Sequence, residues 1–343
     1  MKEPAKRIKK AVIWTVLLLL LTVGVFAWLL RGTDLAGLGA VLARARPHWL
    51  AAGACLVLGS LGCQAVNLRM LLRRCGQRIS LWNSMRAVFI GFYFSGITPS
   101  ASGGQPAQVW QLTRAGVAPG ASAGALLLMQ IAYQAVMIAL GAAGLLLCGG
   151  ALAGLHGETA LLLYGFTAAS VVLALLSAAL FSGAWLRRVG KGLIGLLGRW
   201  RLVRDPDALC VRLERQMEQF DACAALLRRC RPLAARLLFV TLVQQLCLFS
   251  VPVTVYCALG LTGQPLWRLA AAQALLSIAV DTLPLPGAVG ASESAFMAIQ
   301  GLFFGPLALP AMLLSRGLSF YGAMALSALV TAIPQPCAAR RLT

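Results

Sequence analysis

Long apolar stretches, separated by short segments that carry most of the Lys and Arg residues, dominate the chain. Uncharged stretches cover residues 11–30, 49–68, 87–113, 115–155, 159–186 and 237–267. A further apolar region follows them and is interrupted only by Asp281, Glu293 and Arg316. Each simple stretch is long enough to span a membrane, because a helix needs about 20 residues to cross a hydrocarbon core of ~30 Å. The pattern predicts an all-α polytopic membrane protein.

The first stretch, residues 11–30, follows a cluster of Lys and Arg residues, as the apolar part of a signal peptide would. Its apolar run is longer than the roughly 7 to 15 residues of a signal peptide, and no small-residue cleavage site follows it. We interpret it as a membrane span, so that residues 1–48 form an N-terminal span and an outer loop.

Two regions do not fit plain spans. In residues 81–116 an apolar helix is followed by a break rich in Pro and Gly and then by a piece too short to cross, and residues 266–304 have the same form. Pro removes a backbone donor and Gly permits turns that other residues resist, so we interpret both regions as hairpins of re-entrant or broken helices. The residues expected to shape the two tips are Pro99, Gly103, Gly104, Pro106, Pro284, Pro286, Gly287 and Gly290.

Irregular backbone at membrane depth is tolerated only where it is buried in protein or lines a wet cavity. The two tips are therefore candidate walls of a site. In the alternative interpretation, the Pro and Gly residues merely kink membrane helices, in which they are common. Hairpins that cross the membrane fully also remain compatible with the sequence.

The hairpins occupy equivalent places in two halves of the chain. Residues 49–150 comprise a span, the first hairpin and a second span, and residues 233–343 comprise the same parts in the same order. The charge distribution makes the first hairpin enter from the cytoplasmic side and the second from outside, so the halves form an inverted-topology repeat. Paired interrupted segments in two inverted halves are the best sequence indication of a transporter site near the membrane midplane.

Residues 151–232 lie between the two halves. They hold an extra span and a basic amphipathic segment that is expected on the cytoplasmic side. Its basic residues either approach anionic lipid headgroups or simply reflect the membrane topology.

The Lys and Arg residues set the expected orientation. With the N-terminus inside, 25 of the 30 lie in cytoplasmic segments and 4 in outer ones, so both termini are expected in the cytoplasm. A net charge of +20 would also suit a nucleic-acid binder. The apolar runs are too long for a soluble domain, which makes a nucleic-acid partner unexpected.

Three ionisable residues interrupt the C-terminal apolar region. A charge at the bilayer centre costs about 2.5–3.5 kcal/mol on insertion scales, so each needs a partner or a function. Asp281 precedes the second tip and Glu293 follows it, and Arg316 lies in the next span, where it is able to reach one of them. A structural ion pair and a functional one are equally compatible with this spacing.

Polar side chains also recur at and after the tips. Gln105 and Gln108 follow the first tip, Gln130 and Gln134 lie one helical turn apart in the next span, and Ser292 lies in the second tip. They serve either hydrogen bonds between helices or contacts with a substrate.

Sequence motifs of enzymes are missing. There is no HExxH motif, no P-loop, and no GxSxG or GxGxxG in a strand-to-helix setting. The ten cysteines include no CxxC pair, and we interpret them as small buried residues. We therefore expect no catalytic residue, no metal site and no cofactor.

The two tips together resemble the paired motifs of a known family. They read Pro99-Ser-Ala-Ser-Gly-Gly-Gln-Pro-Ala-Gln108 and Pro284-Leu-Pro-Gly-Ala-Val-Gly-Ala-Ser-Glu293. This pair is similar to the motifs of the lysylphosphatidylglycerol synthase transmembrane family, the flippase-like membrane region of the bacterial multiple peptide resistance factor. The resemblance covers roughly residues 49–333.

The resemblance implies movement of aminoacylated phosphatidylglycerol, typically the lysyl ester, to the outer leaflet of the bacterial cell membrane. This movement lowers the negative surface charge and protects against cationic antimicrobial peptides. For such a headgroup, we expect Asp281 and Glu293 to face the ammonium group and Arg316 to face the phosphate. The implied partners are anionic and aminoacylated phospholipids.

This sequence departs from the family pattern in two ways. It ends at Thr343 without the soluble aminoacyl-transferring domain, so we do not expect it to synthesise the lipid, and Gln105 stands where many relatives have an acid. In the alternative function, the chain is a non-transporting scaffold for a separately encoded lipid-modifying enzyme, either a phosphatidylglycerol lysyltransferase or a glycolipid glycosyltransferase. The oligomeric state and the identity of the lipid headgroup remain open.

Overall fold

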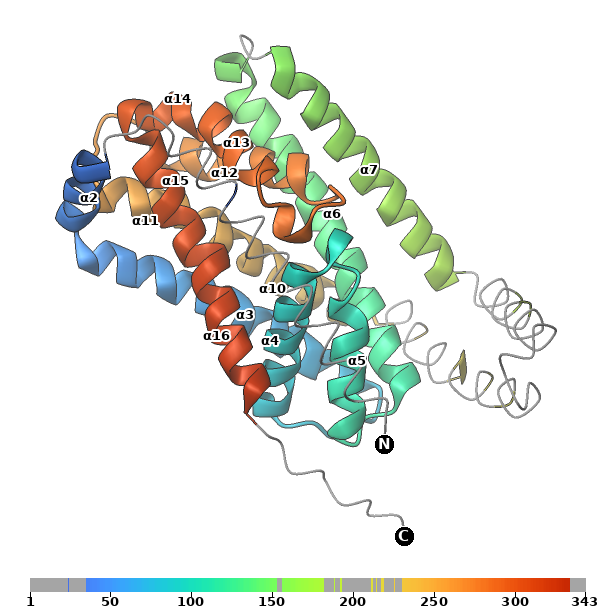
Figure 1. Cartoon of the computed structure of the whole chain (residues 1–343). Helices are drawn as coiled ribbons and strands as arrows, with labels where there is room; N and C mark the ends of the chain where they lie inside the picture. Colours follow the sequence, from blue (N-terminus) through green and yellow to red (C-terminus); the bar gives the residue numbers. More distant parts are fainter. Residues whose placement is uncertain are drawn as a thin grey trace.

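The computed structural model describes residues 35–152, 156–181 and 230–333, together with a few isolated positions. The expected span at residues 11–30 and most of the basic segment before residue 230 lie outside the described residues. Every regular element in the described part is helical, as the apolar pattern predicts (Figure 1). Five helical stretches in it are long and apolar enough to cross a membrane.

The first half of the repeat consists of a long helix, a broken hairpin and a second long helix. Its elements, with a short helix α2 before them, are α2 (Leu35–Arg44), α3 (Pro47–Arg74), α4 (Leu81–Ile97), η1 (Pro99–Ala101), α5 (Gly104–Arg114) and α6 (Pro119–Leu152). Local sequence explains several ends. Pro47 starts α3 in its first turn, and Gly76, with a φ of 76°, follows the end of that helix. The Ser80 hydroxyl caps α4 by accepting from the Asn83 amide at 3.2 Å.

The second half has the same order but is more interrupted. It consists of α10 (Arg231–Phe249), α11 (Val251–Ala258), α12 (Leu266–Val280), η2 (Pro286–Ala288), α13 (Ala291–Ala295), η3 (Phe296–Gln300), α14 (Gly301–Phe304), η4 (Gly305–Leu307), α15 (Ala308–Arg316), η5 (Gly317–Gly322) and α16 (Ala323–Ala332). Two of these elements, η3 and η5, are π-helical. The short helix α2 was not expected from the sequence.

The two hairpins approach each other from opposite ends of the bundle, α4 with α5 from the lower end in Figure 1 and α12 to α14 from the upper end. Their tips, η1 and η2, are in contact. The 17-residue α4 and the 11-residue α5 are both shorter than a span. The second hairpin also begins with a short helix, the 15-residue α12, so both hairpins consist of broken helices, and they enter the bundle from opposite ends.

The long helices hold the hairpins between them. Helix α3 packs against α4, α10 and α11, and α6 packs against α5, α10 and α12. The extra helix α7 (His156–Phe181) lies outside the repeat, along α6 and α12 (Figure 1). Every part of each hairpin thus has a protein neighbour, as irregular backbone inside a membrane requires.

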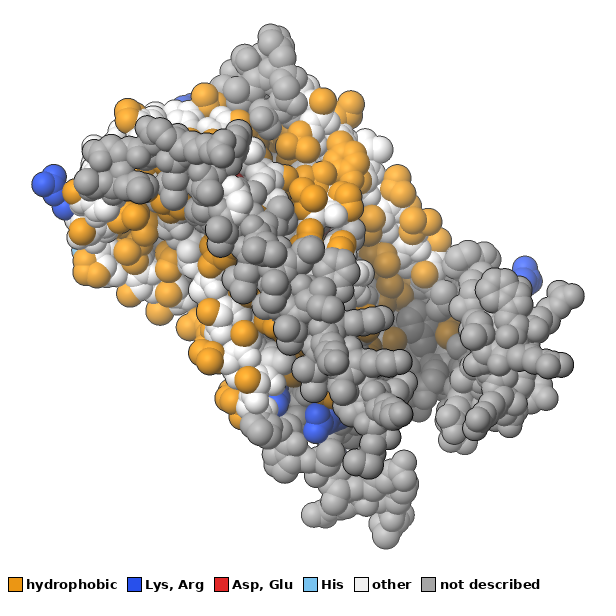
Figure 2. All heavy atoms as spheres, in the orientation of Figure 1, with side chains coloured by type: hydrophobic (Ala, Val, Ile, Leu, Met, Phe, Trp, Pro, Cys, Tyr) orange, Lys and Arg blue, Asp and Glu red, His pale blue; other side chains and the backbone are white. Residues whose placement is uncertain are grey.

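The outer surface of the described bundle is largely apolar. Figure 2 shows hydrophobic side chains over its sides and only a few Lys and Arg side chains, which lie toward its ends. Leu146 on α6, Leu163 on α7 and Leu329 on α16 are among the most exposed large apolar residues. A surface of this kind suits lipid, and the chain is a multi-pass membrane protein.

The cysteines depart from the expectation that all are small buried residues. Cys148 is buried, whereas Cys55 is exposed on the outer surface of α3. Cys75, just after α3, is disulfide-bonded. The expectation of a purely structural, unpaired role was therefore wrong at this position.

Candidate functional site

The two hairpin tips are built by nearly the same turn. Thr98 precedes η1 with φ −112° and ψ 144°, and Leu285 precedes η2 with φ −110° and ψ 139°. Each then has a Pro at the first position of the 3₁₀ turn and an Ala with positive φ at the third, 53° for Ala101 and 50° for Ala288. A left-handed Ala is uncommon, and its recurrence at equivalent places shows that the inverted repeat extends to the tips.

Glycines permit close approaches at both tips. A Cβ atom on Gly104 would lie 1.9 Å from the Ser95 hydroxyl and 2.9 Å from the backbone oxygen of Gly91, so α4 and α5 pack too closely there for a side chain. Gly287 has a φ of 58°, and a Cβ atom on it would lie 2.2 Å from the Phe320 ring. Both tips therefore depend on glycine for contact with the helix beside them.

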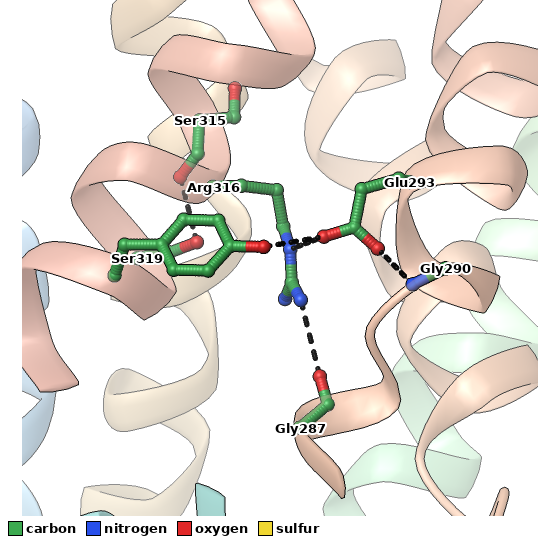
Figure 3. A network of polar contacts seen from close by, with 7 residues as sticks. Gly287, Gly290, Glu293, Ser315, Arg316 and Ser319 are labelled. Carbon is green, nitrogen blue, oxygen red and sulfur yellow. Dashed lines mark hydrogen bonds and ion pairs between the residues drawn. The ribbon is translucent and has the colours of Figure 1, made fainter. Parts of the chain in front are cut away.

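The second tip is fastened by a buried ion pair. Arg316 Nε lies 2.9 Å from Glu293 Oε1, and its Nη2 donates to the Gly287 carbonyl oxygen at 3.1 Å (Figure 3). Glu293 Oε2 accepts from the Gly290 amide at 2.7 Å, and its Oε1 also accepts from the Tyr321 hydroxyl at 3.2 Å. The side chain of Glu293 is 0% exposed. This carboxylate is thus fully paired inside the protein.

The π-helix η5 explains why two residues five positions apart reach the same oxygen. In an α-helix each residue turns by about 100°, so Arg316 and Tyr321 would point some 140° apart. A π-helix closes its hydrogen bonds between residues i and i+5, which stacks these two positions on one face. The local widening of the helix therefore aims both donors at Glu293.

Asp281 is the other acid near the second tip, and its setting differs. It follows α12, and its Oδ1 accepts from the Tyr133 hydroxyl of α6 at 2.6 Å. The Gln134 side chain faces the same carboxylate. The Asp281 residue has exposed surface although it lies among the helices, because it borders open space inside the bundle.

That open space consists of two cavities. The tip cavity, about 320 Å³, lies beside the second tip and is lined mainly by apolar side chains, with Gln245, Ser292 and Arg316 among its polar ones. The amide cavity, about 290 Å³, is lined by Gln64, Asn67, Gln105, Gln108, Gln130 and Gln244 from α3, α5, α6 and α10. Ser95, Ala101, Tyr133 and Asp281 line both cavities. The two cavities therefore meet at the Asp281–Tyr133 pair.

The structure brings most of the sequence-predicted site residues to these cavities. Gln105, Gln108 and Gln130 line the amide cavity, Ser292 and Arg316 line the tip cavity, and Asp281 lines both. Gln134 is buried behind Asp281 and borders neither, and Glu293 also borders neither.

The predicted tip residues have distinct positions. Pro99 and Pro286 start the two 3₁₀ turns, Gly103 and Gly290 precede α5 and α13, and Pro106 lies in the first turn of α5. Pro284 lies in the irregular segment between α12 and η2.

Sequence reasoning missed several residues of the site. The ring of Phe320 lies 4.5 Å from the Arg316 guanidinium carbon, and Tyr321 bonds to Glu293. Ser95 and Ala101 face both cavities. The Arg-x₄-Tyr spacing gives no signal under α-helical periodicity, because only a π-helix aligns positions five apart. Among the described residues, no group of three or more His, Cys, Asp or Glu side chains is placed to hold a metal ion.

The comparison with protein-family models agrees with this architecture. Residues 13–327 match the model described as the lysylphosphatidylglycerol synthase TM region. The chain belongs to this family. No curated protein matches it at a significant level.

Proposed function

We propose that this protein moves a phospholipid with an aminoacylated headgroup, such as lysyl-phosphatidylglycerol, between the leaflets of a bacterial cell membrane. One observation carries the proposal. An acidic side chain, Asp281, is open to two cavities at the place where the two inverted hairpins meet. A carboxylate in that position is suited to a cationic group crossing the bilayer, because a buried charge needs a counter-charge.

The two acids have different proposed roles. Asp281 faces the ammonium group of the lipid, because its carboxylate borders both cavities and its hydrogen-bonding neighbours Tyr133 and Gln134 are uncharged. Glu293 already accepts bonds from Arg316, Tyr321 and Gly290 and has no exposed surface. Its proposed role is to hold the second tip and to keep Arg316 in place.

Arg316 is proposed to face the lipid phosphate. It lines the tip cavity, and only two of its five N–H donors are used in the bonds to Glu293 and Gly287. A guanidinium with donors left over is the usual partner of a phosphate oxygen. Headgroups would thus pass along the cavities while the acyl tails remain in the surrounding lipid.

Leaflet exchange in proteoliposomes tests this function. The purified chain is reconstituted with labelled lysyl-phosphatidylglycerol, phosphatidylglycerol or a glycolipid, and the headgroup exposed outside is measured with an impermeant reagent. Faster exchange of the lysyl lipid than in protein-free liposomes supports the proposal. No exchange of any lipid, with and without a proton gradient, favours a scaffold of a separately encoded lipid-modifying enzyme instead.

A further inference from the structure

The amide cavity has a lining of unusual uniformity for the interior of a membrane protein. Six of its side chains are Asn or Gln, and they come from four different helices. Asp281 at its border is the only ionisable carboxylate, and no Lys or Arg lines it among the described residues. Amides inside a bilayer need hydrogen-bond partners, because an unsatisfied polar group is costly there.

Few hydrogen bonds join these amide side chains to one another. Gln105 Nε2 approaches Gln130 Oε1 at 3.5 Å, and Asn67 Nδ2 donates to Thr241 Oγ1 at 3.1 Å. No further bond joins these lining side chains in the part of the chain that the structure describes. Each primary amide offers two hydrogen-bond donors and two acceptor positions. Most of the hydrogen-bonding capacity of these side chains is therefore directed to the cavity.

Asn67 shows which kind of group is missing. The Thr241 hydroxyl donates its single proton to the Leu237 carbonyl oxygen at 2.8 Å, so its oxygen is left as an acceptor for Asn67. Asn67 must therefore turn its NH₂ group toward Thr241, which fixes the amide orientation. Its Oδ1 is then an acceptor without a partner, in a residue that is only 1% exposed. A group that reaches this buried oxygen must donate a hydrogen bond to it.

We propose that the amide cavity binds a neutral, hydroxyl-rich lipid headgroup, such as a glycerol or a sugar. A hydroxyl both donates and accepts, as an amide does, so a ring of amides complements several hydroxyls at once. A phosphate would call for Arg or Lys, which do not line this cavity among the described residues, and an ammonium group would bind at Asp281 on its border rather than at the amides. This inference deepens the proposed function, because it names the part of the transported lipid that is recognised next to Asp281.

The size and depth of the cavity agree with this occupant. Its volume of about 290 Å³ lies at the lower end of ligand sites, which suits a headgroup rather than a whole lipid. Gln130 lies 11 residues beyond the start of α6 at Pro119, or about 17 Å along the helix. Gln130 therefore lies well inside the candidate span Pro119–Cys148 and not at its end, where a headgroup in transit would need polar partners.

Lipid binding to the purified full chain, measured by native mass spectrometry, tests the inference without requiring transport. The probes are phosphatidylglycerol, glucosyl-diacylglycerol, phosphatidylethanolamine and phosphatidic acid with matched acyl chains. We expect at least one of the two hydroxyl-rich lipids to bind about tenfold more tightly than phosphatidylethanolamine and phosphatidic acid. Preference for phosphatidylglycerol identifies a glycerol site, and preference for the glucosyl lipid identifies a sugar site.

Two variants locate the site. Gln64→Leu removes a partly buried amide from the cavity and should abolish the preference, whereas Gln264→Leu removes a partly buried amide that lines neither cavity and should retain it. Asn67→Leu should act like Gln64→Leu where it folds. Equal binding of all four lipids, or an unchanged preference in Gln64→Leu, would overturn the inference. Neither result bears on transport, which the leaflet exchange assay measures separately.

Discussion

The Tyr133 hydroxyl donates a 2.6 Å hydrogen bond to Asp281 Oδ1 and thereby joins α6 of the first half to the broken helix of the second. Both residues line both cavities, so this bond lies at the boundary between them. A cation that reaches Asp281 from either cavity meets a carboxylate that is already oriented by Tyr133. The pair therefore joins the two inverted halves at the place where we propose that the cationic headgroup binds.

Replacing Tyr133 with Phe separates the orientation of the Asp281 carboxylate from its charge. Tyr133→Phe keeps the ring and the Asp281 carboxylate but removes the bond between them, which contributes on the order of 1.5 kcal/mol as a hydrogen bond to a charged group. We expect the rate of lysyl-phosphatidylglycerol exchange to fall by about tenfold, less than in a variant without the carboxylate. A rate equal to that of the wild type would show that the bond does not position Asp281.

The Glu293–Arg316 pair should contribute strongly to stability. Removing one partner leaves the other charge buried, which typically costs about 3–5 kcal/mol. We expect Glu293→Gln and Arg316→Gln each to lower the melting temperature of the purified protein, and the double variant to lower it by less than the sum of the two. Additive effects would mean that the two side chains stabilise the second tip independently.

Gly287 should tolerate a side chain poorly for a reason beyond its backbone angle. Gly287→Ala places a methyl group against the Phe320 ring and also forces Ala into a positive φ. Gly263 likewise has a positive φ, of 95°, but open space surrounds it, so Gly263→Ala tests the backbone angle alone. The angle alone costs about 1 kcal/mol, and overpacking adds about 1–3 kcal/mol.

Thermal melting compares these two glycines. Gly287→Ala should lower the melting temperature more than Gly263→Ala, and Phe320→Leu in the Gly287→Ala background should recover part of the difference. Equal effects at both positions would exclude the contact with Phe320 as the cause.

The membrane orientation is testable by thiol labelling. Arg73, Arg74, Arg78 and Arg114 gather at the end of the bundle where the first hairpin begins and ends, so the positive-inside rule places that end in the cytoplasm. In a chain without its native cysteines, an impermeant reagent applied to intact cells should label Gln264→Cys, before α12, and not Gln77→Cys, before α4. The opposite pattern would invert the topology and the predicted direction of transport.

Much of the fold was predictable from the sequence, because each long helix contains a long uncharged run and each hairpin carries a Pro- and Gly-rich break. The limits of α3, α4, α5 and α6 follow these signals closely. The sequence also indicated that Arg316 reaches one of the two acids, since few charges lie in the apolar region.

Other features of the site depend on contacts that a single sequence does not display. The π-helix η5, which brings the Tyr321 hydroxyl to the same Glu293 oxygen as Arg316, is not predicted by α-helical periodicity. The Asp281–Tyr133 bond joins residues 148 positions apart, and the left-handed Ala101 and Ala288 have no side-chain signature. The short helix α2 lacks the length of a span and was overlooked for that reason.

The proposed transport depends on binding of the cationic headgroup by Asp281 during its passage. Its most direct test is leaflet exchange of lysyl-phosphatidylglycerol by Asp281→Asn, a change that keeps the size of the side chain and removes its charge. The matched control is Thr167→Val, which removes a hydroxyl from the exposed surface of α7, away from both cavities. We expect Asp281→Asn to lower exchange to the rate of protein-free liposomes and Thr167→Val to exchange like the wild type. Wild-type exchange by a folded Asp281→Asn variant would contradict this expectation.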